Sequence, residues 1–307
     1  MTRLFSYANR PFHLGPYPLE KLARSDAAPD LSRLKVTPGI SFRRPDDATS
    51  IVNAMQDYQA MLDATRDGLV KSERAVVPDD LNERARNLKS FAYFCDTDMV
   101  AICEVPGAAW RKDTIHNPDV DRLAEKLRAK QTSTLAAGID VIMAGLRENM
   151  AAPPTDCRHH SHAIVLMVQI GRPPRTDEAG CDWLDDALEQ RTCLRAAETA
   201  VTLASYIRSL GFEACAHSGA ASDVAMERLA VASGLALIKD GHAESPFLGR
   251  NFGLAVITTT FAMACDRPLS ASARPPASWA SGLGRHAKSR RNRDPFARRN
   301  YRDGAHP

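Results

Sequence analysis

An almost continuous apolar run at residues 163–170, Ala-Ile-Val-Leu-Met-Val-Gln-Ile, limits the possible folds more than any other segment. It is short, contains several β-branched residues and is closed by Gly171, a pattern that predicts a strand. Side chains of a strand alternate between its two faces, so both faces of this one are apolar. We therefore expect the run at the centre of a sheet that has other elements packed on each side.

Three more strands and four helices are predicted around this run. Strands are expected at residues 99–105, 212–217 and 252–260. Apolar residues at helical spacing predict helices at 51–69, 79–95 and 183–210, and another that is capped by Ser222 or Asp223 and ends at Gly234. Residues 239–251 are interpreted as a polar loop. This combination predicts an α+β fold in which a mixed sheet is layered with helices.

Three of these helices have an apolar side. For the helix at 79–95 it consists of Leu81, Ala85, Leu88, Ala92 and Cys95. For the helix at 51–69 the expected buried side chains are Ile51, Met55, Tyr58, Leu62 and Leu69, with Gly68 as its stop. For the long helix at 183–210 they are Leu184, Leu188, Leu194, Ala197, Val201, Ala204, Ile207 and Leu210, with Gly211 just past its end. On the same helix Tyr206 is interpreted as a packing residue and Arg208 as a solvated charge.

The ends of the chain differ in composition from its middle. Residues 1–50 are expected to form an extended arm, with one short helix that has Pro18 in its first turn. Residues 51–270 are the predicted domain. Residues 271–307 are expected to be a basic linker or tail, in which residues 285–307 carry eight Lys or Arg and two Asp. A flexible linker is favoured over a nucleic-acid-binding arm, because few aromatic side chains are present there for stacking on bases.

Cysteine usage and hydropathy narrow the cellular compartments and the cofactors that are possible for this protein. The seven cysteines are scattered and form no Cys-x-x-Cys pair, which is typical of a reducing compartment. This spacing argues against an iron–sulfur cluster and against a zinc knuckle built from paired cysteines. No apolar stretch approaches the ~20 residues that span a bilayer, and the first residues lack the apolar core of a secretory signal. We expect a cytoplasmic protein without a membrane partner.

Two segments carry candidate ligand-binding residues. The turn at residues 217–223, His-Ser-Gly-Ala-Ala-Ser-Asp, lies between a predicted strand and a predicted helix. Backbone N–H groups at a helix start favour an anion such as a phosphate, although the same residues could serve only as a turn and a helix cap. The segment Cys157-Arg-His-His-Ser-His could hold a metal through its imidazoles. A solvated loop is favoured for it, so no metal ligand is assigned.

Several segments, taken in order along the chain, resemble one protein family. They are His-Leu-Gly-Pro-Tyr-Pro-Leu-Glu at 13–20, Asp-Met-Val-Ala-Ile-Cys-Glu-Val-Pro at 98–106, residues 200–217, Leu-Gly-Arg-Asn-Phe-Gly-Leu-Ala-Val-Ile-Thr-Thr-Thr at 248–260, and Asp-Arg-Pro-Leu at 266–269. Together they are similar to the cobalamin-binding half of reductive dehalogenases of the soluble, catabolic type. The similarity to epoxyqueuosine reductases is more distant. The resemblance covers most of residues 1–270.

The resemblance implies a nitroreductase-like fold that binds cobalamin, followed in complete proteins by a ferredoxin-like module with iron–sulfur clusters. The soluble catabolic members resemble a duplication, in which an amino-terminal copy of the cobalamin fold has lost its cofactor. On this resemblance the candidate cofactor-binding residues are His217, Ser218, Ser222, Gly249 and Gly253. The catalytic residues stay unassigned.

Two departures favour the degenerate amino-terminal copy. Residues 270–276, Ser-Ala-Ser-Ala-Arg-Pro-Pro, stand where a complete enzyme would enter its cysteine-rich module. Residues 234–241, Gly-Leu-Ala-Leu-Ile-Lys-Asp-Gly, stand where active copies have a Gly-Leu-Gly-Glu turn. In addition, residues 7–18 align without gaps with residues 296–307 and share Ala, Arg, Gly and Pro. This repeat indicates an internal duplication whose second unit would begin where the chain stops.

The sequence therefore predicts a reductive dehalogenase family protein, whose complete members remove halide from haloaromatics. This chain is expected to be a truncated, non-catalytic repeat without an iron–sulfur cluster and without a cofactor of its own, although the resemblance leaves cobalamin possible. Its expected partner is a polypeptide or domain that carries the active cobalamin unit and the ferredoxin-like clusters. The alternative is a free-standing flavin- or cobalamin-binding reductase domain.

Overall fold

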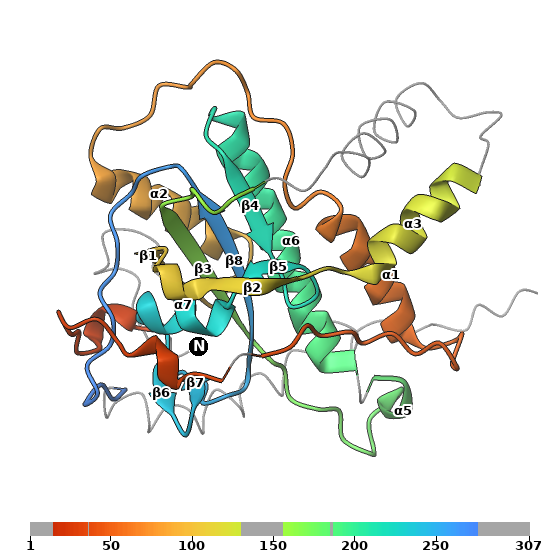
Figure 1. Cartoon of the computed structure of the whole chain (residues 1–307). Coiled ribbons are helices and arrows are strands. Elements are labelled where there is room, and N and C mark those ends of the chain that lie inside the picture. Colours follow the sequence, from red (N-terminus) through yellow and green to blue (C-terminus); the bar gives the residue numbers. More distant parts are fainter. Residues whose placement is uncertain (1–14, 36, 130–155, 185–186, 276–307) are drawn as a thin grey trace, which may run out of the picture.

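The computed structural model describes residues 15–35, 37–129, 156–184 and 187–275 of the chain (Figure 1). Its helices are α1 (Ile51–Asp63), α2 (Leu81–Phe94), α3 (Pro118–Ala129), α5 (Cys181–Leu184), α6 (Leu188–Ser209) and α7 (Met226–Ala232), with short 3₁₀ helices η2 (Leu19–Lys21), η3 (Leu31–Arg33) and η4 (Gly107–Ala109). Its strands are β1 (Met99–Glu104), β2 (Trp110–Ile115), β3 (His162–Gln169), β4 (Ala214–His217), β5 (Ser222–Val224), β6 (Leu237–Lys239), β7 (His242–Glu244) and β8 (Phe252–Thr259). Within these ranges, each helix is too short or too polar to cross a bilayer. The basic tail lies almost wholly outside the described residues.

The predicted central strand, β3, lies inside a four-stranded sheet of order β1-β3-β8-β4. Val165 of β3 is opposite Ala101 of β1 on one side and Val256 of β8 on the other. The predictions of strands at these four places are confirmed. All three pairings are antiparallel, so the prediction of a mixed sheet is wrong. Apolar patterning shows that a strand is buried, but it does not show the direction in which the strand enters the sheet.

The core has two halves, one on each face of this sheet (Figure 1). Ile164, Leu166 and Val168 of β3 face α2 and α6, where they pack with Leu88 and Leu203. The alternate side chains of β3 face α7 and the first described residues of the chain. Those side chains are Ala163, Val165 and Met167. The expectation of cover on both faces is confirmed.

The first described residues add to the core on the α7 side. Buried side chains from this segment are Tyr17, Leu19, Leu22, Leu31 and Leu34. The guanidinium of Arg24 donates hydrogen bonds of 2.9 Å to the carbonyls of Gly234 and Arg267. Arg24 also forms a β-bridge with Leu269. The predicted short helix is present as η2, and Pro18 precedes it instead of standing in its first turn.

Helix α1 buries a different side from the one expected. Its buried residues are Val52, Gln56, Gln59, Ala60 and Asp63. Tyr58 is 65% exposed, and Leu69 lies beyond the helix end and is 85% exposed. The prediction failed because three of the five buried side chains of α1 are polar, so the apolar stripe does not identify the buried side.

The long helix α6 begins later than predicted and rests on β8 with small side chains. The buried apolar residues on this helix are Ala196, Ala197, Ala200, Leu203, Ala204 and Ile207. Trp183 lies in the separate helix α5 and is 84% exposed, so the predicted start at residue 183 is wrong. Gly211 follows the helix with a φ of +85°, as expected for a residue just past a helix end.

Two local predictions between β4 and β8 are also wrong. Helix α7 begins at Met226 after Ala225, and no side chain caps it, whereas Ser222 and Asp223 lie in β5. The segment predicted as a polar loop contains the hairpin β6–β7. Its turn is Asp240-Gly241, where both residues have positive φ, the conformation that Asp-Gly favours in two-residue hairpin turns.

Gly253 tests the fit of β8 against α6. A Cβ at this position would lie 2.9 Å from Cγ2 of Thr192, whose hydroxyl is bonded to Leu188 O within the helix. Thr192 is buried and β-branched, so it cannot move aside easily. We expect Gly253→Ala to lower the free energy of unfolding by about 1–3 kcal/mol, the usual cost of overpacking. Urea unfolding followed by circular dichroism measures this change.

Gly107→Ala is the matched control, because no atom lies within 4 Å of a Cβ built at Gly107. We expect this variant to stay within about 1 kcal/mol of the wild type. Equal losses in the two variants would argue against a packing role for Gly253.

Candidate functional site

The turn between β4 and β5 brings polar side chains together at one end of the central sheet. Ser218 organises the turn: its N–H donates to Ala221 O at 2.8 Å, and its hydroxyl accepts from the N–H groups of Ala220 and Ala221. The chain reverses there, and Asp223 returns beside His217, with its N–H 3.3 Å from Nδ1 of that imidazole. The turn is thus held by its own hydrogen bonds.

Ser218 also donates to a buried carboxylate. Asp63, the last residue of α1, is 5% exposed. Its carboxylate accepts hydrogen bonds from Ser218 Oγ at 2.8 Å, Asn117 Nδ2 at 2.8 Å and Gln59 Nε2 at 3.0 Å. Burial raises the pKa of Asp63, and these three hydrogen bonds oppose the rise. The carboxylate therefore connects α1, the residue before α3 and the β4–β5 turn.

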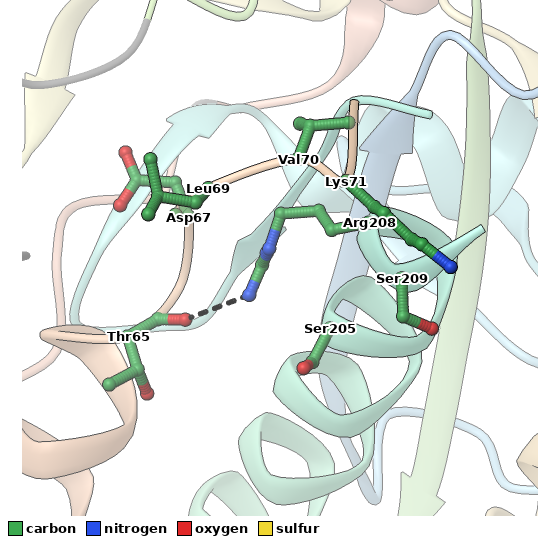
Figure 2. Close-up of a pocket in the computed structure, with 9 residues that line it drawn as sticks. Thr65, Asp67, Leu69, Val70, Lys71, Ser205, Arg208 and Ser209 are labelled. Atoms are coloured by element: carbon green, nitrogen blue, oxygen red, sulfur yellow. Dashed lines mark hydrogen bonds between the residues drawn. The ribbon is translucent and has the colours of Figure 1, made fainter. Parts of the chain in front are cut away.

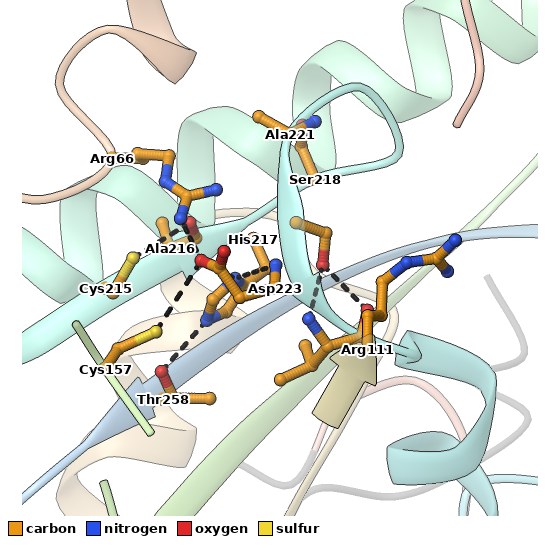
Figure 3. Close-up of polar contacts among 12 residues, drawn as sticks. Arg66, Arg111, Cys157, Cys215, Ala216, His217, Ser218, Ala221, Asp223 and Thr258 are labelled. Carbon is orange, nitrogen blue, oxygen red and sulfur yellow. Dashed lines mark hydrogen bonds and ion pairs between the residues drawn. The ribbon is translucent and has the colours of Figure 1, made fainter. Parts of the chain in front are cut away.

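Four side chains of metal-ligand type meet beside this turn, and we call them the four-donor cluster: Cys157, Cys215, His217 and Asp223 (Figure 3). Their donor atoms all lie within 4.8 Å of one another. Asp223 Oδ2 is 3.6 Å from Cys157 Sγ and 3.7 Å from His217 Nδ1. Cys215 and His217 are two residues apart on β4 and so point to the same face. The first three residues are buried, and the side chain of Asp223 is 20% exposed.

A guanidinium lies at the edge of the cluster. Arg66 pairs with the carboxylate of Asp223. Burial lowers the pKa of Arg66, but the neighbouring Cys215 and Asp223 outweigh it, so this pKa is raised. The pKa of the Cys157 thiol is raised by its hydrogen bond with Cys215 and by burial. Arg66 is therefore a permanent cation here, and Cys157 is a neutral thiol at neutral pH.

A line of polar contacts connects the cluster with the surface. His217 Nε2 and His160 Nδ1 each lie 2.9 Å from Thr258 Oγ1. Because a hydroxyl carries one proton, it donates to at most one of the two imidazoles and accepts from at least one. His160 Nε2 is 3.6 Å from Glu213 Oε2, and the exposed His159 pairs with the same carboxylate. Burial lowers the pKa of both His217 and His160, so both imidazoles are neutral at pH 7.

Arg208 supports the loop that carries Arg66. It is 7% exposed and donates to Ala214 O at 2.9 Å and to the carbonyl of Arg66 at 3.3 Å. Figure 2 shows its third contact, with the carbonyl of Thr65 at 3.5 Å. The interpretation of Arg208 as a solvated charge is therefore wrong. A cavity of about 550 Å³ borders it, also lined by Thr65, Asp67, Gly68, Leu69, Val70, Lys71, Ser205 and Ser209.

The five residues expected to bind a cofactor lie in three places. His217, Ser218 and Ser222 share the β4–β5 turn, where all three are buried. Their polar atoms contact protein groups, as when the Ser222 hydroxyl donates to a backbone carbonyl in β5 at 2.8 Å. Gly253 lies on β8 against α6, and Gly249 lies in the turn after β7 with a φ of +62°.

The imidazoles of residues 157–162 converge only in part: ligand atoms of His159, His160 and Glu213 lie within 4.8 Å of one another, and His162 is outside this group. Cys157 joins the four-donor cluster, His160 bonds to Thr258, and His162 Nδ1 lies 2.8 Å from Ser161 Oγ. Cys215 was not among the sequence candidates. The spacing Cys-x-His inside a predicted strand was the available signal, because it places two donors on one face.

Comparisons with known proteins give matches among solved structures alone, since no family model and no curated protein matches the chain. N-terminally tagged catabolic reductive dehalogenase NpRdhA is 34% identical over 87% of this chain, with a TM-score of 0.63. NpRdhA in complex with 3-bromo-4-hydroxybenzoic acid is 33% identical over 87% of the chain, with the same TM-score. A reductive dehalogenase whose structure suggests a mechanism for B12-dependent dehalogenation is 34% identical over 88%. The chain spans 32% of the length of each of these proteins.

His160 is expected to make stability depend on pH. Burial and then His159 lower its pKa, so the unfolded chain takes up this proton at a higher pH than the folded chain. The contribution of neutral His160 to the free energy of unfolding is therefore fully present above about pH 6.5, and it is lost as the pH falls through the folded-state pKa. Urea unfolding should show His160→Gln reducing this loss by up to about 1.4 kcal/mol per pH unit. The same slope in His160→Gln and wild type would contradict the prediction.

Arg208 is expected to be important for stability. Arg208→Met keeps much of the apolar stem but leaves the carbonyl of Ala214 without this donor. We expect a loss of about 2–4 kcal/mol in the free energy of unfolding, as for a buried hydrogen bond to a charged group. Arg191→Met, at an exposed position of the same helix, should change stability by less than about 0.5 kcal/mol. Chemical denaturation compares the two variants, and a neutral Arg208→Met would show that the guanidinium is dispensable.

Proposed function

The chain belongs to the reductive dehalogenase family over the 87% of its residues that align with the catabolic members, and we propose that it is a non-catalytic cobalamin-fold repeat of such a protein. The observation that carries this proposal is the inward orientation of the candidate cofactor residues. His217, Ser218 and Ser222 are buried and bonded to other protein groups, so they present no polar atom to a ligand outside. By this proposal, reductive removal of halide from a haloaromatic takes place on another unit.

The sizes of the cavities support the same conclusion. Two cavities formed by the described residues have volumes of about 550 and 670 Å³. Cavities of about 300–1,000 Å³ suit drug-sized ligands, and a cobalamin with its nucleotide tail is several times larger than such a ligand. Neither of these two cavities is large enough for a whole cobalamin, which supports the proposal, and no step of cobalt chemistry is assigned to the chain.

The arrangement of layers supports a nitroreductase-like fold for this repeat. One antiparallel sheet has α2 and α6 on one face and α7 on the other. The helix α6 packs along β8, and the remaining strands form small two-stranded sheets at the side of the core (Figure 1). In this proposal the repeat has kept the architecture of the cobalamin fold while its interior is filled by side chains.

The proposed partner is a polypeptide or domain, in the cytoplasm, that carries the active cobalamin unit and the ferredoxin-like clusters. The chain spans 32% of NpRdhA, so much of that protein has no counterpart in the aligned region.

Cofactor reconstitution tests the proposal. The full chain is incubated separately with hydroxocobalamin and with flavin mononucleotide, passed through a gel-filtration column and measured by absorption spectroscopy. Neither cofactor should elute with the protein in a stoichiometric amount. With a chemical reductant and added hydroxocobalamin, the chain should release no more bromide from 3-bromo-4-hydroxybenzoic acid than free hydroxocobalamin does. NpRdhA treated in the same way is the positive control.

Retention of one cofactor would instead support the alternative, a free-standing flavin- or cobalamin-binding reductase domain. A stoichiometric corrinoid spectrum would identify a free-standing cobalamin-binding domain, and a bound flavin would identify a flavin reductase. Either result would overturn the assignment of a non-catalytic repeat.

A further inference from the structure

We propose that the four-donor cluster of Cys157, Cys215, His217 and Asp223 binds one zinc ion in a closed, four-coordinate site. Two thiolates, one imidazole and one carboxylate are all ligands that zinc takes in proteins, and four protein ligands are typical of structural zinc. The site does not depend on cobalamin or on the partner unit, so it stands or falls separately from the proposed function.

The spacing of the donor atoms suits a tetrahedral ion. Zinc bonds of about 2.0–2.3 Å place two tetrahedral ligand atoms about 3.3–3.8 Å apart. Asp223 Oδ2 lies 3.6 Å from Cys157 Sγ and 3.7 Å from His217 Nδ1, both within that range. All four donor atoms lie within 4.8 Å of one another, so small side-chain rotations bring the remaining distances to the same values.

The hydrogen bonds around His217 prepare its ligand atom. If Nε2–H of His217 donates to Thr258 Oγ1, the hydroxyl proton of Thr258 is available for Nδ1 of His160. Nε2–H of His160 then points toward Glu213. This assignment leaves Nδ1 of His217 without a proton, so that without metal it accepts the Asp223 N–H at 3.3 Å, a weak contact that zinc would replace. A ring N–H held by a second group is the usual way in which a protein orients a zinc-bound histidine.

The charges balance when the ion is included. Zinc displaces the protons of both thiols, and two thiolates and one carboxylate around a divalent cation leave one net negative charge, which is costly in a buried place. Arg66 contacts the carboxylate of Asp223 and cancels that charge. Arg66 now contacts Oδ2, the oxygen that also faces Cys157 and His217, so zinc binding needs the guanidinium to shift to Oδ1, where a zinc-bound carboxylate still accepts hydrogen bonds.

The position of the cluster indicates a structural role. Cys157 precedes β3, Cys215 and His217 belong to β4, and Asp223 belongs to β5. An ion held by these four would link three segments that are otherwise joined by backbone and side-chain hydrogen bonds. Cys157, Cys215 and His217 are buried, so no ligand position faces a substrate, and the partly exposed Asp223 gives the ion its route in.

Metal analysis of the full chain tests the site. Protein purified with a thiol reductant and supplied with zinc should retain about one zinc per chain by mass spectrometry of the metal. Replacement by cobalt(II) should give the strong visible bands of a tetrahedral ion and a thiolate-to-metal charge-transfer band. The double variant Cys157→Ser, Cys215→Ser should lose both signals. Cys103→Ser removes an equally buried thiol outside the cluster and should keep them.

A change at Thr258 separates metal binding from folding. Thr258→Val removes the hydroxyl that fixes the His217 tautomer and leaves all four ligands in place. Competition with a chromophoric chelator should show zinc affinity falling about 10–100-fold, as for other groups that hold a zinc ligand in position. This measurement also serves if the double cysteine variant does not fold.

Three results would overturn the proposal. The first is a reduced wild-type chain that binds neither zinc nor cobalt. The second is bound cobalt without thiolate charge transfer, or with equal content in the double variant. The third is a disulfide between Cys157 and Cys215 in the isolated protein, with no metal uptake after its reduction.

Discussion

The rest of the structure depends on the burial of β3 on both faces. The side chains on both of its faces are essentially inaccessible to solvent, and strands pair with it along both edges. A strand in this position needs a layer of helix on one face and a second layer on the other, which here come from distant parts of the chain. The helical layer can approach closely because α6 presents Ala196, Ala200 and Ala204 to the sheet and β8 has Gly253 where Thr192 projects.

At one end of this apolar core the interior becomes polar. Asp63, Arg208 and His217 are all buried there, and each has several hydrogen-bond partners from different elements. A buried polar group without a partner is costly, so such groups determine the local arrangement once they are paired. The loop after α1 is held by Arg208, and the β4–β5 turn is held by Asp63. These contacts bring the four-donor cluster together.

The sequence was sufficient to predict an element and its buried side where burial follows the apolar pattern. The runs at β1, β3 and β8 and the apolar side of α2 were predicted, because the same residues both form the element and cover the core. It was not sufficient for α1, where Gln56, Gln59 and Asp63 are the buried side chains. For a similar reason, the four-donor cluster could not be predicted from the sequence. Cys157 and Asp223 come near β4 through a turn and an antiparallel crossing, and neither contact leaves a periodic pattern.

The contacts of Arg24 affect the order in which the protein can fold while it is being synthesised. Its guanidinium bonds to carbonyls 210 and 243 residues away in the chain, and Tyr17 and Leu34 belong to the same apolar cluster as Leu254 and Leu269. A ribosome releases the first of these segments long before the last. The early segment therefore cannot pack when it emerges, and the leucines that are later buried in the core stay in contact with water or a chaperone. The face of the sheet toward α7 can close only after β8 has emerged, whereas α2 and β1 can already have met.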